Sequence, residues 1–236
     1  MSIEMNAGDV GGKSGEAKSG KAVQTMPSAA PMESNVYIHS YRNIGIPNCG
    51  QAAVATLLDH WGYDPFHLPR HAPDPVNKMM YWADTTVIKL ICEKYGNDTG
   101  LFGATPNRVR SALIAFSDKK ISTDIYYSGL NVSWTVLWDN LLALLNKGVI
   151  PIVLLECAPL AKALGGWDAN PLTGHYVPVW GFRDGFVFIG NSLSPPNKNY
   201  PDGNQAIPTG VFQEAWMCKT YPWPLNNVII SYYGTN

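Results

Sequence analysis

The sequence predicts an α+β fold in which a helical half comes first and an antiparallel sheet follows. Before Gly148, apolar residues recur at helical spacing in several segments. These segments are Gln51–Trp61, Met79–Tyr95, the stretch that begins at Thr105, and Thr135–Lys147. After Gly148, short apolar runs rich in β-branched residues take over. These runs are Val149–Leu155, His175–Phe182, Gly185–Gly190 and Asn227–Tyr233. Helices followed by strands that pair through hairpins are typical of α+β domains.

Boundary signals support individual elements. Gly62 provides a stop for the first helix. Thr105 is suited to cap the third predicted helix, because its hydroxyl can accept a hydrogen bond from a first-turn N–H, and Pro106 fits the first helical position. Arg183-Asp184-Gly185 separates two of the predicted strands and is a hairpin turn signal. We therefore expect the strands on either side of Asp184 to pair with each other.

Composition limits the possible partners and the domain organisation. The chain has 236 residues, 46% of them hydrophobic and 15% charged, with a formal net charge of -1. No run of basic residues indicates nucleic acid or a membrane surface as a partner. Residues 1–34 are rich in Gly, Ser, Lys and Glu and have no aromatic residue, so we expect a disordered tail. Residues 35–236 are predicted to form one folded domain.

The N-terminal segment has no apolar core of the kind found in signal peptides, and no stretch is apolar enough to span a bilayer. We therefore expect a cytoplasmic protein, or one delivered into a target cell by a dedicated secretion system. The cysteines are scattered without the close spacing that zinc sites require. We expect no metal and no cofactor.

Cys49 is the candidate nucleophile. It opens the first predicted helix, where unpaired backbone N–H groups and the positive end of the helix dipole favour the thiolate form. Small residues at Gly50 and Ala52-Ala53 leave room beside it for a substrate. The alternative is a small buried cysteine at a helix start.

His175 is the candidate base and Asn191 the candidate orienting residue. His175 begins an otherwise apolar strand, so we expect it at a rim rather than deep inside. A tight turn at Asp184-Gly185 returns the second strand toward the first, and this places Asn191 near His175. The Asn191 oxygen can then accept the ring N–H and fix the tautomer. Each residue alone is also compatible with an ordinary strand end.

Several groups could donate the hydrogen bond that stabilises the oxyanion. The backbone N–H of Cys49 is one candidate, and the side-chain amides of Asn43 and Asn48 are others. Asn43 is favoured, because an amide directly next to the nucleophile would have to fold back sharply. A nucleophile, a base and an orienting residue follow one another along the chain in the order Cys, His, Asn. With an oxyanion donor, they fulfil the roles that covalent thiol catalysis requires.

The chain resembles the papain-like superfamily and, within it, the C39-like peptidases. The residues that carry the resemblance are Asn48-Cys49-Gly50-Gln51-Ala52-Ala53, Gly103-Ala104-Thr105-Pro106, Gly148-Val149-Ile150-Pro151-Ile152-Val153, and Gly174-His175-Tyr176-Val177-Pro178-Val179-Trp180-Gly181-Phe182 with Asn191. The sequence departs from the family at two positions. It has Asn191-Ser192 where Asp-Pro is usual, and it offers Asn43 where the family usually has Gln.

The resemblance implies a papain-like cysteine peptidase domain, with a helical half that carries Cys49 and a sheet half that carries His175 and Asn191. It also implies cleavage after Gly-Gly in a protein or peptide substrate. A deamidase or transglutaminase could use the same triad, and a catalytically inactive binding module is a further alternative. A bacterial toxin or effector role is also open. In that case an immunity or inhibitor protein would be expected at the cleft.

Overall fold

The computed structural model describes the parts of the chain that carry its helices and strands. The described residues are 48–61, 91, 104–117, 121–127, 132–165, 167, 173–192, 204–217 and 228–234. The predicted tail at 1–34 lies outside them. The predicted helix Met79–Tyr95 also lies outside them except for Ile91, which is helical.

The described residues form five helices, three of 11 to 13 residues and two of 8 residues. They are α1 (Cys49–His60), α3 (Pro106–Phe116), α4 (Trp134–Asn146), α5 (Cys157–Leu164) and α6 (Thr209–Trp216). The N-cap expected at Thr105 is present, since its hydroxyl accepts a hydrogen bond from the Arg108 N–H at 3.4 Å. Ser133 caps α4 in the same way through the Val136 N–H. Both caps satisfy N–H groups that have no partner within their own helix.

The strands form one antiparallel sheet. They are β1 (Ile121–Tyr127), β2 (Ile152–Glu156), β3 (Gly174–Arg183), β4 (Phe186–Gly190), β5 (Asn204–Pro208) and β6 (Val228–Gly234). Their order across the sheet is β1-β6-β2-β3-β4-β5. The predicted hairpin joins β3 and β4. Asp184 and Gly185 at its turn have φ values of 50° and 79°, the left-handed conformations that a tight two-residue turn needs.

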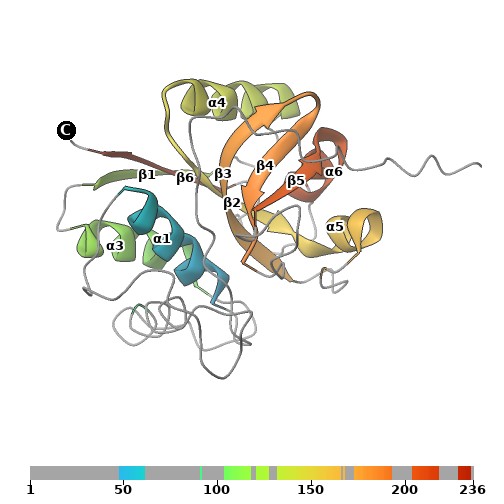
Figure 1. Ribbon diagram of the computed structural model, residues 1–236. Helices are drawn as coiled ribbons and strands as arrows, with labels where there is room; N and C mark the ends of the chain where they lie inside the picture. The colour runs from blue at the N-terminus through green and yellow to red at the C-terminus, as the bar shows by residue number, and fades with distance from the viewer. Residues whose placement is uncertain are drawn as a thin grey trace, which may run out of the picture.

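Side chains that alternate along the strands supply two hydrophobic clusters, one on each face of the sheet. Ile152, Tyr176 and Trp180 pack with residues of α1 and α3 in one cluster. Val153, Val177 and Val179 pack with residues of α4, α5 and α6 in the other. Figure 1 shows α1 and α3 together on one side of β3, and α4, α5 and α6 around the rest of the sheet. This arrangement brings the start of α1 against β3, where the candidate base lies.

The α+β prediction is confirmed, although the simple order of helices before strands is not. β1 precedes α4, and α5 and α6 lie in the sheet half. Pro159 within α5 and the short length of β5 and α6 weaken the periodic pattern in these segments. Among the described helices, none is long and apolar enough to cross a membrane.

Candidate functional site

Cys49 is the first residue of α1, and its thiol meets backbone N–H groups from two parts of the chain. The N–H groups of Gly50, in the same helix, and Tyr176, in β3, both donate to the Cys49 sulfur. The side chain is buried, with 7% of its surface exposed. The bond from Tyr176 links the start of α1 to the strand that carries His175.

Gly50 makes this close approach of α1 possible. A Cβ atom at Gly50 would lie 2.9 Å from Val109 Cγ2 on α3 and 3.4 Å from Tyr176 Cδ2. The first of these distances is shorter than side-chain contacts allow. A residue without a side chain therefore lets the first turn of α1 sit between α3 and β3.

His175 is the second residue of β3, and it is buried rather than placed at a rim. Only 1% of its surface is exposed, so the expectation of a rim position is wrong. Backbone pairing places Leu155 of β2 beside it. The Trp167 ring lies edge-on to the imidazole, with the ring centroids 5.3 Å apart and the planes at 82°. The strand pattern does not predict this contact, because Trp167 lies in the segment before β3.

Asn191 follows β4 and contacts His175 as the hairpin geometry predicts. Its Oδ1 lies 3.1 Å from His175 Nε2. Its Nδ2 donates to Gln205 Oε1 on β5 at 2.8 Å. Because the Asn191 oxygen accepts from Nε2–H, the other ring nitrogen, Nδ1, carries the lone pair that can act as a base. His175, Asn191 and Gln205 form a hydrogen-bonded series, called here the base row.

Burial dominates the electrostatics of both candidate catalytic groups. Desolvation raises the pKa of Cys49 above its usual value, although the N–H groups of Tyr176 and Gly50 act in the opposite direction. Desolvation also lowers the pKa of His175 to about 4, while the hydrogen bond to Asn191 favours the charged form. The helix start was expected to favour the thiolate, and its N–H groups do act in that direction, but desolvation outweighs them. Burial therefore favours the neutral form of both groups.

A neutral pair can still carry out thiol chemistry. A neutral imidazole is the form that accepts a proton, and a nearby base can remove the thiol proton as the sulfur attacks. The proton transfer then accompanies the attack instead of preceding it.

Of the two asparagines predicted to donate to the oxyanion, only one is among the described residues. Asn43 lies outside the described residues. Asn48 directly precedes α1 and is buried, with 1% of its surface exposed. Its Oδ1 has no hydrogen-bond partner among the described atoms. The N–H groups at the start of α1 remain the other candidate donors.

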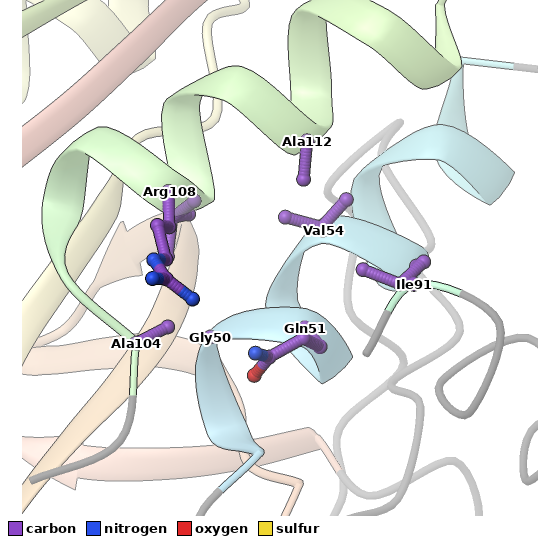
Figure 2. A pocket seen from close by; sticks show the side chains of 8 residues that line it. Gly50, Gln51, Val54, Ile91, Ala104, Arg108 and Ala112 are labelled. Atoms are coloured by element: carbon purple, nitrogen blue, oxygen red, sulfur yellow. The ribbon is translucent and has the colours of Figure 1, made fainter. Parts of the chain in front are cut away.

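An open hollow of about 180 Å³ lies beside the first turn of α1. Figure 2 shows it between α1 and α3, with the guanidinium of Arg108 and the amide of Gln51 near Gly50. Among the described residues, no group of His, Cys, Asp and Glu side chains could hold a metal ion.

Three features of the site were missed from sequence. They are the backbone N–H of Tyr176, the cover by Trp167 and the partner of Asn191 at Gln205. Gln205 of β5 pairs with Ile189 of β4, two residues before Asn191, and Asn204–Pro208 has no alternation of polar and apolar residues that would indicate this strand.

Comparison with known proteins gives only remote matches. No family model matches the sequence, and no curated protein sequence does. Among solved structures, the chain is similar to a double glycine motif protease from an AMS/PCAT transporter in complex with the leader peptide, at 12% identity and a TM-score of 0.44. That match covers 85% of this chain and 94% of the other.

The chain is also similar to a candidate C39-like peptidase from Bacillus anthracis. The identity is 13% and the TM-score 0.49, over 85% of this chain and 96% of the other. At these identities and TM-scores, the likeness concerns the fold alone.

Proposed function

We propose that this chain is a papain-like cysteine peptidase in which Cys49 is the nucleophile, His175 the general base and Asn191 the residue that orients the base. One observation carries the proposal. The Cys49 sulfur accepts a hydrogen bond from the N–H of Tyr176, the residue directly after His175. The Nε2 of His175 in turn donates to Asn191 Oδ1. The bond from Tyr176 brings the start of α1 next to the part of β3 that carries His175, and this supports a site shared by the thiol and the imidazole.

In the proposed reaction, His175 Nδ1 takes the thiol proton while the sulfur of Cys49 attacks the carbonyl carbon of a peptide bond. N–H groups at the start of α1, or the amide of Asn43 or Asn48, stabilise the negative oxygen. His175 then gives its proton to the leaving amine as the carbon–nitrogen bond breaks, which leaves a thioester on Cys49. Water attacks the thioester with His175 again as base, and the acid product leaves as the thiol re-forms.

The neutral resting pair supports this order of events. Because burial lowers the pKa of His175 and raises that of Cys49, the thiol proton is expected to move to Nδ1 as the sulfur attacks. The base row keeps Nδ1 available throughout.

Cleavage by matched cysteine variants tests the proposal. Cell extract is incubated with the wild type, Cys49→Ala or Cys157→Ala, and new protein N-termini are identified by mass spectrometry. New termini are expected with the wild type and with Cys157→Ala, and none above background with Cys49→Ala. Equal cleavage by wild type and Cys49→Ala would overturn the assignment.

The same experiment separates the rival chemistries. Conversion of Gln or Asn side chains to acids, or new Gln–Lys cross-links, without new termini would identify a deamidase or transglutaminase with the same nucleophile. The residues before each cut test the preference for Gly-Gly. Slower growth of cells that produce the wild type, but not Cys49→Ala, tests the toxin or effector role.

A further inference from the structure

We infer that Gln205 is a positioning residue for the proposed catalysis, because it sets the amide orientation of Asn191 and through it the tautomer of His175. The inference relies on the proposed function for its catalytic meaning. The hydrogen-bond arrangement itself can be tested without any substrate.

The register of the sheet places the whole base row on one face. Val179 pairs with Ile189, and Ile189 pairs with Gln205, so these three side chains point to the same side. Side chains two residues apart in a strand share a face, which adds His175 and Asn191 to that side. Asn191 and Gln205 are thus diagonal neighbours across β4 and β5, within reach of long side chains.

An asparagine amide has an oxygen that accepts and a nitrogen that donates, so it can face a histidine in two ways. With Oδ1 toward His175, Asn191 holds a proton on Nε2 and leaves Nδ1 as the base. With Nδ2 toward His175, it would hold the proton on Nδ1 and block the base. Gln205 Oε1 accepts from Asn191 Nδ2 at 2.8 Å, and this bond selects the first orientation.

Burial makes this selection strong. Asn191 is 3% exposed and His175 is 1% exposed, so little water competes for the amide. A hydrogen bond shielded from water costs more to lose than one at the surface, because the abandoned donor stays unsatisfied. Without the Gln205 oxygen, Asn191 Nδ2 loses the acceptor at 2.8 Å that favours Oδ1 toward the imidazole.

Two substitutions at Gln205 separate this role from a merely structural one. Gln205→Met keeps the length of the side chain and removes the acceptor. Gln205→Glu keeps acceptors only, so it must still take the hydrogen bond from Asn191 Nδ2. Gln213→Met is the matched control, because Gln213 is also partly buried but lies on α6.

The test measures ¹⁵N chemical shifts of the imidazole nitrogens in the full-length chain, which distinguish the two neutral tautomers. His175→Gln identifies the His175 signals. The Nε2–H tautomer is expected in the wild type, in Gln205→Glu and in Gln213→Met. A mixture of tautomers is expected in Gln205→Met. An unchanged Nε2–H tautomer in Gln205→Met would overturn the inference, whether or not the protein is a peptidase.

Turnover provides the second readout. Gln205→Met should lower kcat about tenfold with little change in KM, the size expected for one shielded hydrogen bond. Gln205→Glu should restore most of the rate and shift the acid limb of the pH profile upward, because its negative charge favours the protonated imidazole. Equal loss in Gln205→Met and Gln205→Glu would show that Gln205 acts through packing and would overturn the inference.

Discussion

Cys49 and Cys157 occupy similar local positions, yet only one lies in a candidate site. Each is the first residue of a helix, α1 and α5, and each is buried, at 7% and 0% exposed. The N–H of Cys157 donates to the Thr173 carbonyl at 3.0 Å, which ties the end of β2 to the start of β3. At Cys49, by contrast, the N–H of Tyr176 donates to the sulfur itself.

The comparison shows that a helix N-terminus does not by itself make a cysteine a nucleophile. Burial raises the pKa of Cys49 and so opposes the effect of the helix start. What distinguishes Cys49 is the contact of its sulfur with the N–H of Tyr176, the residue after His175, whose Nε2 lies 3.1 Å from Asn191 Oδ1. Substitutions at His175, Asn191 and Gly50 can test these differences one at a time.

Removal of the base should have the largest effect. His175→Ala is expected to lower peptidase activity by about 10³-fold or more, since it removes both proton transfers of the proposed mechanism. Activity is measured as release of new termini from a cleaved protein. His60→Ala, at the last residue of α1, is the control and should retain activity. Comparable activity in both variants would contradict the role of His175.

Loss of the orienting residue should cost less. Asn191→Ala is expected to lower kcat by roughly 10- to 100-fold and to leave residual activity, because a base without its partner is still present for part of the time. Ser192→Ala is the matched control. Ser192 is buried beside Asn191, and its hydroxyl has no hydrogen-bond partner among the described atoms. If Ser192→Ala were as damaging as Asn191→Ala, the loss would reflect packing rather than orientation.

The buried imidazole should also make stability depend on pH. The pKa of His175 is about 4 in the folded chain, whereas an unfolded histidine titrates near 6.5. Between these values the unfolded chain binds more protons, so stability is full above about pH 6.5 and falls as the pH falls toward 4. His175 alone should account for a loss of about 2 kcal/mol between about pH 7 and pH 5.

Urea unfolding at the two pH values measures this loss. His175→Gln has no titrating ring, so it should show a smaller difference between the two pH values than the wild type. The same pH dependence in both proteins would mean that His175 is not buried as a neutral group.

A smaller effect is expected from closing the space beside Cys49. Gly50→Ala should destabilise the fold by about 1–3 kcal/mol, because the new Cβ would overpack against Val109 Cγ2. Gly210 is likewise the second residue of a helix, α6, but a Cβ there meets nothing within 4 Å. Gly210→Ala should therefore be neutral or stabilise the fold by up to about 1 kcal/mol. Thermal or urea unfolding of the two variants distinguishes them, and equal stability would contradict the tight packing at Gly50.

Local signals were enough to predict part of the site. The turn at Asp184-Gly185 determines how β3 and β4 pair, and so the contact of His175 with Asn191 follows from a short stretch of sequence. The helix start at Cys49 follows from the periodicity of the residues after it. The α+β class follows from the change of pattern at Gly148.

The remaining features depend on residues that are distant in sequence. β6 inserts between β1 and β2, and β5 pairs with β4, so neither neighbour can be read from local pattern. The Trp167 ring lies edge-on to His175, and Gln205 accepts a hydrogen bond from Asn191. The direction of the Cys49 pKa shift depends on how desolvation compares with nearby N–H groups, a balance that only three-dimensional packing sets.

The most direct test of the central claim compares the reactivity of the two buried thiols. The folded wild type and His175→Ala are treated with iodoacetamide near pH 7, and the alkylation of Cys49 and Cys157 is followed by peptide mass spectrometry. The account predicts that Cys49 reacts about tenfold or more faster than Cys157 in the wild type, and that His175→Ala removes most of this difference. Equal rates in the wild type, or an advantage of Cys49 that is as large in His175→Ala as in the wild type, would contradict the pairing of Cys49 with His175.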